Sequence, residues 1–343
     1  MKNLRQSVLI NPPSEHFVNN KLFDLSDLRL NRDGTLLPFH RLKHELSIKN
    51  ISINTPDLLS SGGIRDAKHC YYSLGILEEP FSQPENNEIE LKGFLIMEPP
   101  VVAPELYEAL PELTRKFDKV YVHNTVGDGY SLNGVDQTRL EKLYWPQPYW
   151  GILEKFWGRT KRLKRIVVIN GNHKPKKMNH ELYSKRIYAM ATLFKFNIVD
   201  LYGRGWGRWW SRTSFWLPYW LHLSKLMSIY KGECESKYEV LSNYQYSLCF
   251  ENMEMKGYVS EKIFDCFYAG TIPIYWGAPD INSLIPPKLF IDARQFSSWG
   301  ELWKKVSSIS DQDLQDMRNE TRVFLTSDIF LKYYNSLANI VEQ

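Results

Sequence analysis

The polar residues with the clearest chemical potential lie near position 260, between two apolar segments. Glu251 and Asn252 directly follow the first apolar segment, and Tyr258 leads into Glu261 and Lys262 at the start of a helical pattern. A lysine beside a helix N-terminus suits phosphate, because the backbone N–H groups and the helix dipole also favour an anion there. Glu261 could accept hydrogen bonds from ribose hydroxyls, and Tyr258 could donate one or stack. These residue types in this order point to a nucleotide-containing ligand.

The elements that must position these residues form a β-loop-α-β unit. The predicted strand, helix and second strand cover 246–250, 258–269 and 271–275. Open α/β sheets bind ligands at the carboxyl ends of their strands, where this unit gathers its polar residues. Spacing alone equally allows a solvated helix start for Glu261 and Lys262, and a turn or helix cap for Glu251.

Strands and helices alternate along most of the 343 residues, which predicts parallel sheets with crossover helices. A segment rich in proline and aromatic residues, 144–150, interrupts this alternation, and a basic run at 161–165 precedes the next strand. We place a domain boundary between these landmarks. The sequence thus predicts two Rossmann-like α/β domains, over 1–155 and 156–343, with the terminal helices in the second.

Composition and charge narrow the classes of protein further. The formal net charge of +4 does not demand nucleic acid as a partner, and the four cysteines show no metal-ligand spacing. The N-terminal residues lack an apolar stretch of signal-peptide length. The longest uncharged apolar run, 214–224, is shorter than the roughly 20 residues of a membrane-spanning helix. We therefore expect a cytoplasmic protein.

The second half carries an ordered series of motifs. Its segments are Phe250–Asn252, Gly257–Lys262, Ala269–Pro279 and Ile285–Ile291. This series resembles the signature of the α1,3/4-fucosyltransferase family, glycosyltransferase family 10, with Ser260 in place of the usual threonine. Weaker similarity covers Val199–Gly205. Arg186 falls at the position of an arginine that meets the donor pyrophosphate in related enzymes, and arginine can pair with a phosphate through two parallel hydrogen bonds.

The resemblance implies a GT-B fold, in which two Rossmann-like domains face each other across a cleft. It also implies transfer of L-fucose from GDP-β-L-fucose, with inversion at the anomeric carbon, to a glycan acceptor such as an oligosaccharide or a lipid-linked polysaccharide. The implied donor-binding residues are Arg186, Glu251, Asn252, Tyr258, Glu261 and Lys262. No cofactor is required, because fixed cationic groups can stabilise the leaving diphosphate, although a divalent cation could stimulate transfer.

Inversion in one displacement needs a base that removes the proton of the acceptor hydroxyl as its oxygen attacks. Glu98 closes the apolar strand predicted over 93–97 and precedes two prolines, which places a carboxylate at a strand end. On its own, a glutamate before Pro-Pro is most often a solvated loop residue. The resemblance implies the catalytic role, because the family's proposed base follows the corresponding strand.

A possible metal motif has a simpler explanation. Asp311-Gln312-Asp313 has the D-x-D pattern that elsewhere holds a metal on a sugar nucleotide. Acidic residues are also typical of the first turn of a helix, and a helix is predicted here. We favour the helix start and predict no metal site.

Residues 203–230 are predicted to form an aromatic-basic loop, which interleaves tryptophans with arginines. Four interpretations stay open: aromatic side chains buried against the second domain, peripheral contact with the inner membrane through residues 204–220, a saccharide platform, and stacking on nucleic acid. We favour the first and expect no nucleic-acid partner. The alternatives to fucosyl transfer are another nucleotide sugar on the same fold, and a non-enzymatic protein that binds nucleic acid or a membrane surface.

Overall fold

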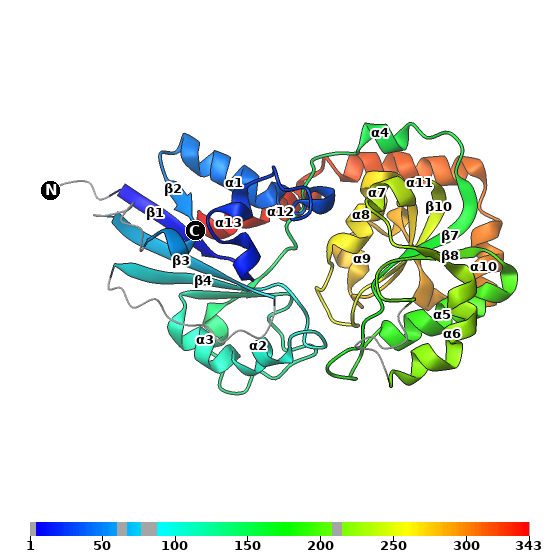
Figure 1. The fold of residues 1–343 in the computed structure, drawn as a ribbon, viewed down its shortest axis with the longest axis horizontal. Helices are drawn as coiled ribbons and strands as arrows, with labels where there is room; N and C mark the ends of the chain where they lie inside the picture. Colours follow the sequence, from blue (N-terminus) through cyan, green and yellow to red (C-terminus); the bar gives the residue numbers. More distant parts are fainter. Residues whose placement is uncertain (1–4, 60–66, 77–87, 208–214, 343) are drawn as a thin grey trace. The chain divides into compact units, whose positions relative to one another are not determined.

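The computed structural model describes residues 5–59, 67–76, 88–207 and 215–342. They form two compact units, each built on one six-stranded sheet (Figure 1). Unit 1 comprises residues 1–148 and 332–343, and unit 2 comprises residues 149–331. The predicted α/β class with parallel sheets is confirmed.

The sheet of unit 1 has the order β2-β1-β3-β4-β5-β6, and every neighbouring pair is parallel. Its strands are β1 (Arg5–Asn11), β2 (Ser52–Asn54), β3 (Ala67–Gly75), β4 (Ile89–Ile96), β5 (Lys119–Val122) and β6 (Leu140–Lys142). Its main helices are α1 (Leu37–Ile48), α2 (Pro104–Glu108), α3 (Leu110–Lys116) and α13 (Ser336–Val341). In β1, Val8 and Ile10 enter a core shared with α1 and α13, while Leu9 enters one shared with α2 and α3. Both faces are covered, as is typical of parallel sheets.

The end of the chain differs from the prediction. Residues 332–343 were expected in the C-terminal domain, but they belong to unit 1, and the division falls after 148 instead of 155. Helix α12 (Asp328–Tyr334) leads from unit 2 back to unit 1. The physical reason is burial: Leu337 and Ile340 of α13 are in the core of unit 1, and Tyr72 Oη donates a hydrogen bond to the Val341 carbonyl over 3.4 Å.

The sheet of unit 2 has the order β12-β11-β10-β7-β8-β9, again entirely parallel. Its strands are β7 (Leu163–Ile169), β8 (Val199–Tyr202), β9 (Tyr230–Gly232), β10 (Tyr244–Phe250), β11 (Ile272–Trp276) and β12 (Ile291–Asp292). Its helices are α4 (Glu154–Trp157), α5 (Tyr183–Leu193), α6 (Leu217–Ile229), α7 (Lys237–Leu241), α8 (Glu261–Ala269), α9 (Ile281–Leu284), α10 (Trp299–Ser307) and α11 (Asp311–Phe324). Helices α5, α6 and α10 pack together, and α7, α8 and α11 form a second group (Figure 1).

The strand order of unit 2 contains a topological switch point. Strands β7 and β10 are neighbours, but α5 carries the chain from β7 toward β8, whereas α8 carries it from β10 toward β11. Crossovers of one hand that leave in opposite directions place α5 and α8 on opposite faces of the sheet. The carboxyl ends of β7 and β10 therefore flank the crevice where open α/β sheets bind ligands.

Helix α6 was missed in the sequence, where residues 203–230 were expected to be an irregular aromatic-basic loop. It is a 13-residue helix with Pro218 in its first turn, a position where the missing N–H of proline needs no partner. Apolar residues occur on all sides of this helix, so no polar face marked it as helical.

Candidate functional site

The end of β10 is fastened to the start of α8 by Glu251. Its carboxylate accepts hydrogen bonds from Ser260 N (2.9 Å) and Ser260 Oγ (2.6 Å), and Ser260 is the N-cap of α8. Burial raises the pKa of Glu251, while Lys262 and the Ser260 hydrogen bonds oppose that rise. Glu251 is 0% exposed. The prediction that it lines a donor pocket therefore needs correction: its carboxylate is enclosed by the protein and positions the first turn of α8.

Gly277, after β11, leaves the room that Glu251 occupies. A Cβ atom at this glycine would lie 2.5 Å from Glu251 Cγ and 2.3 Å from Tyr275 Oη, both belonging to buried side chains. The Glu251 backbone N–H also donates to the Trp276 carbonyl over 2.9 Å. The packing of Glu251, which follows β10, thus explains why a glycine stands at position 277 after β11.

Lys262 and Glu261 lie at the exposed end of this arrangement. Lys262 Nζ is 3.5 Å from both Glu251 Oε2 and Glu261 Oε1. The side chain of Lys262 is 19% exposed and that of Glu261 is 35% exposed. Partial burial works to raise the pKa of Glu261, but Lys262 and Lys237 outweigh it and hold the pKa below its ordinary value. Glu261 is therefore a carboxylate at neutral pH and can accept hydrogen bonds, with a cation beside it.

Asn252 and Tyr258 hold the loop between β10 and α8. Asn252 Nδ2 donates to Tyr258 Oη over 3.4 Å, and the Asn252 carbonyl accepts a hydrogen bond from Leu182 N over 3.0 Å. The second bond ties β10 to the residue directly before α5. Tyr258 is 0% exposed, so the structure packs its ring instead of presenting it to solvent, whereas Asn252 is half-buried.

Arg186 lies in the first turns of α5, on the other side of the switch point. It is 2% exposed, and among the described residues none accepts a hydrogen bond from its Nε or Nη1. Burial lowers the pKa of Arg186, while the charges of Tyr183, Glu181 and Glu251 oppose that shift. A buried guanidinium with unbonded N–H groups is costly, and an anion with two oxygens would satisfy them. The structure thus brings the charge of Arg186 near Glu251, and Glu251 near Lys262.

A comparison with family models finds a match to the half of the chain that contains this arrangement. The model of glycosyltransferase family 10 (fucosyltransferase), C-terminal part, matches residues 160–318, which contain both β7 and the complete β10–α8–β11 unit. Residues 160–318 are thus similar to the C-terminal part of glycosyltransferase family 10. The two Rossmann-like units of the chain constitute the GT-B type of fold.

Curated proteins of known activity match this chain over short segments. The α-(1,3)-fucosyltransferase FucT of Helicobacter pylori is 45% identical over 67 residues, which are 20% of this chain and 14% of the relative. The α-(1,4)-fucosyltransferase of Arabidopsis thaliana is 37% identical over 71 residues, 21% of this chain and 18% of the relative. The chain therefore spans less than a fifth of the length of either relative.

Among solved structures, an α1,3-fucosyltransferase matches over the whole chain. The TM-score is 0.51 at 16% sequence identity, and the match covers 100% of this chain and 91% of the other. At this identity the likeness concerns the fold.

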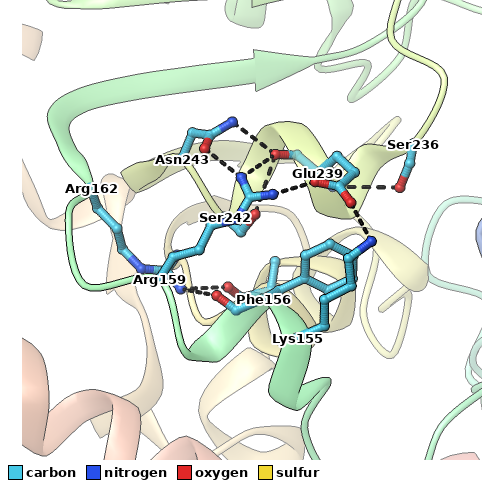
Figure 2. Close-up of polar contacts among 9 residues, drawn as sticks. Lys155, Phe156, Arg159, Arg162, Ser236, Glu239, Ser242 and Asn243 are labelled. Atoms are coloured by element: carbon cyan, nitrogen blue, oxygen red, sulfur yellow. Dashed lines mark hydrogen bonds and ion pairs between the residues drawn. The ribbon is translucent and has the colours of Figure 1, made fainter.

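A polar network supports α7, the helix that packs beside α8 (Figure 2). Glu239 accepts from Lys155 Nζ over 2.6 Å and from Arg159, and Arg162 Nη2 donates to the Phe156 carbonyl over 2.9 Å. The bonds from Lys155 and Arg159 fix α4 and the segment after it against α7.

A buried ion pair then connects α7 to α8. Asp265 pairs with Lys237, and Tyr238 Oη donates to Asp265 over 3.1 Å. Burial raises the pKa of Asp265 to about 6, with Lys237 opposing. The position of the first turn of α8 thus depends on contacts from α7 as well as on Glu251.

The loop after β8 wraps the end of β7. Gly203 has a φ of 137°, and a Cβ atom there would lie 1.9 Å from the Asn170 carbonyl oxygen. Trp206 Nε1 donates to the same oxygen over 2.6 Å, and both Trp206 and Trp216 are buried. The interpretation of this segment as buried aromatic side chains is confirmed for these two. Residues 208–214 of the segment, which include Arg208, Trp209, Trp210 and Arg212, lie outside the described ranges. No helix in the part of the chain that the structure describes has the length and apolar character needed to cross a bilayer.

Glu98 lies two residues beyond β4, the strand that ends at Ile96, and is half-buried. Its carbonyl accepts a hydrogen bond from Tyr107 Oη over 3.2 Å, and Met97 N donates to the Gly75 carbonyl over 2.9 Å. The predicted position at a carboxyl strand end of unit 1 is confirmed, whereas its role as base stays a prediction.

The D-x-D pattern belongs to a helix cap. Ser310 and Asp313 form a reciprocal capping box at the start of α11, as favoured from the sequence. Within the described ranges, no group of three His, Cys, Asp or Glu side chains is arranged to hold a metal ion.

Sequence reasoning missed three residues next to the candidate site. Trp276 Nε1 donates to Glu254 Oε1 over 2.5 Å, and Lys185, which precedes Arg186, lies 3.4 Å from the same carboxylate oxygen and 4.1 Å from the centroid of a Trp276 ring. Lys185 and Trp276 line a cavity of about 290 Å³. Its other lining residues are Tyr188, Thr192, Ala293, Phe296, Ser297, Ser298, Trp299 and Gly300. The cavity forms from three separate segments, which no local pattern joins.

Proposed function

We propose that this protein is an inverting fucosyltransferase, which moves L-fucose from GDP-β-L-fucose to a hydroxyl of a glycan acceptor. The observation that carries the proposal is Arg186, a buried cation whose Nε and Nη1 have no acceptor among the described residues. It lies at the switch point where sheets of this type bind ligands. The family match and the fucosyltransferases of H. pylori and A. thaliana support fucose as the donor sugar.

The donor-binding roles divide between direct contact and support. Arg186 and Lys262 neutralise the diphosphate, and the ionised Glu261 accepts hydrogen bonds from ribose hydroxyls. Asn252 and Tyr258 hold the loop that leads to α8. The enclosed Glu251 acts through Ser260 and Lys262.

In the proposed reaction, Glu98 takes the proton of the acceptor hydroxyl while its oxygen bonds to the anomeric carbon of fucose. The bond between that carbon and the β-phosphate oxygen breaks on the opposite side of the sugar, which inverts the configuration. GDP leaves with the electron pair of the broken bond, and the two cations stabilise the charge on its diphosphate.

Replacing Glu98 with alanine tests the base. We expect the turnover number to fall by about 10²–10⁴-fold, the usual contribution of general-base catalysis, while GDP affinity stays unchanged. The exposed Glu105 in α2 of the same unit offers a matched control, Glu105→Ala, which should transfer at the wild-type rate. Full transfer by Glu98→Ala would remove Glu98 from the mechanism.

A panel of nucleotides tests the donor class. Thermal stabilisation by GDP, and not by UDP or ADP, supports the proposal, because a ligand that binds only the folded state raises its stability. Preferential stabilisation by UDP would favour another nucleotide sugar, and stabilisation by oligonucleotides alone would favour a binding protein. Repeating the transfer assay with a chelator and with added Mg²⁺ or Mn²⁺ establishes whether a divalent cation stimulates transfer.

The acceptor is found by incubating the protein with GDP-fucose on an array of glycans. Mass spectrometry and NMR of the product give the acceptor and the linkage position.

A further inference from the structure

The backbone that carries Glu98 is held by hydrogen bonds at three points. Met97 N donates to the Gly75 carbonyl of β3 over 2.9 Å, and the Met97 carbonyl lies 2.8 Å from Nε2 of His123, just after β5. The Glu98 carbonyl accepts a hydrogen bond from Tyr107 Oη of α2 over 3.2 Å. Three different elements of unit 1 thus hold the two residues that follow β4.

The hydrogen bond from His123 continues the pairing of two neighbouring strands. Strands β4 and β5 pair as far as Leu95 with Tyr121, and the same register places Met97 opposite His123. Strand β5 ends at the residue before His123, so a side-chain donor continues the pairing there. A carbonyl oxygen only accepts hydrogen bonds, so Nε2 carries a proton and donates it to this bond.

Both donors to this segment are packed in place. His123 is 1% exposed, and the ring of Trp145 lies nearly parallel to its imidazole, with 6.1 Å between the centroids. Tyr107 is 5% exposed, and its ring centroid is 4.9 Å from that of Tyr130. Burial raises the pKa of Tyr107 well above its ordinary value, and the charges of Tyr130 and Glu98 add to the rise. The Tyr107 hydroxyl therefore stays protonated and remains a donor.

A general base must hold its carboxylate within hydrogen-bond reach of the proton that it takes, and a misplacement of about 1 Å can cost about 10²-fold in rate. We propose that His123 and Tyr107 are positioning residues, which fix the backbone of Glu98 so that its carboxylate reaches the acceptor hydroxyl. This role rests on the proposed function, in which Glu98 is the base.

Substitutions at the two donors test the proposal on the full chain. His123→Leu removes the imidazole donor, and Tyr107→Phe removes the hydroxyl but keeps the ring. Each should lower the turnover number by about 10-fold to 10²-fold, because the carboxylate is no longer held in place. GDP affinity should stay unchanged, because the proposed donor-binding residues belong to unit 2. The assay measures transfer from GDP-fucose to the glycan that the wild type modifies on the array, with GDP release into water as a second measurement.

A double-mutant cycle with Glu98→Ala separates positioning of the base from a general structural role. If His123 acts through Glu98, His123→Leu should slow the wild type but cause no further loss in Glu98→Ala. His123→Gln should restore most of the turnover, because the glutamine Nε2 can donate from nearly the same place. The pH profile of kcat/KM in His123→Gln should match that of the wild type, because the imidazole is not the base.

The control is a second buried histidine in the same sheet. His69 is also 1% exposed but lies near the start of β3, away from the carboxyl ends of the strands. His69→Leu should therefore transfer fucose at the wild-type rate. Melting temperatures establish which variants are folded, and Tyr107→Phe and His123→Gln, which keep the shape of the side chain, carry the test if His123→Leu does not fold.

Four results would contradict the proposal, and each has a different meaning. Unchanged turnover in His123→Leu and Tyr107→Phe would overturn it and leave Glu98 as the base. Equal losses from His123→Leu with and without Glu98 would give His123 a role independent of the base. A His123→Gln variant as slow as Glu98→Ala would make the imidazole itself the base. Full transfer by Glu98→Ala would overturn the proposed base and the positioning role together.

Discussion

Replacing Arg186 with methionine separates the contribution of this residue to ligand binding from its contribution to folding. Methionine has a similar length but no charge and no N–H group. Because the guanidinium is buried and its Nε and Nη1 are unbonded among the described residues, the wild-type side chain destabilises the fold. The same feature prepares it to bind an anion.

The structure sets the size of both effects. Each unsatisfied buried donor group costs about 1–3 kcal/mol, and Arg186 has two of them, so we expect Arg186→Met to raise the free energy of unfolding by about 2–6 kcal/mol. For a domain of this size, the melting temperature then rises by about 2–4 °C per kcal/mol. The loss of two charge-assisted hydrogen bonds, each about 1.5–3 kcal/mol, should weaken GDP binding by about 10²–10⁴-fold.

Isothermal titration with GDP and urea denaturation without ligand measure the two quantities. Arg186→Lys keeps the charge but not the planar pair of donors, and should bind GDP with intermediate affinity. The exposed Arg322 on α11 provides the control, since Arg322→Met should change neither quantity. A variant at Arg186 that is less stable, or that binds GDP like the wild type, would refute the reasoning.

Three further predictions concern the framework around the site. Gly203→Ala should destabilise unit 2 by several kcal/mol in urea denaturation, because the new Cβ would overlap the Asn170 carbonyl. Gly207→Ala is the control and should be tolerated, because a Cβ there would lie 3.8 Å from the nearest atom. The pKa of Asp265 is about 6 in the folded protein and 3.8 in the unfolded chain, so folding is favoured when Asp265 is protonated. This contribution to the free energy of unfolding is complete below about pH 4 and is lost as the pH rises through about 6. Asp265→Asn should remove this pH dependence, which amounts to about 3 kcal/mol between about pH 4 and about pH 7. Leu337→Ala should lower the free energy of unfolding of unit 1 by about 2–5 kcal/mol, as measured by urea denaturation.

Each of these has a control in the chain. Asp316→Asn, the same substitution on the exposed side of α11, should leave the free energy of unfolding of unit 2 unchanged at neutral pH. Leu331→Ala, outside unit 1 and 37% exposed, should leave the stability of unit 1 unchanged. Parallel pH profiles for wild type and Asp265→Asn would show that Asp265 titrates normally.

The sequence predicted the strands of the candidate site because each lies inside a parallel sheet. Buried on both faces, β10 and β11 appear in the sequence as mainly apolar runs. Gly270 ends α8 in the left-handed conformation expected of a helix C-cap. The predicted strand, helix and second strand therefore agree with the structure to within a few residues.

What the sequence did not reveal depends on contacts between distant segments. Glu251 follows a strand and so looked like a cleft residue, but its burial is decided by Ser260, nine positions later, and by the space beside Gly277. Similarly, no local pattern in α13 indicates that Leu337 completes the core of the other unit. Helix α6 lacked a periodic signal because both of its sides are apolar.

The return of the chain to unit 1 has a consequence for its synthesis. Unit 2 is one uninterrupted segment, whereas unit 1 is assembled from residues on both sides of it. A ribosome therefore delivers a complete unit 2 before the helix that covers one face of unit 1 exists. Until Leu337 and Ile340 have left the exit tunnel, part of the apolar surface of unit 1 stays uncovered. The nascent chain should thus complete unit 2 first and need chaperone protection for unit 1, most of which was translated earlier.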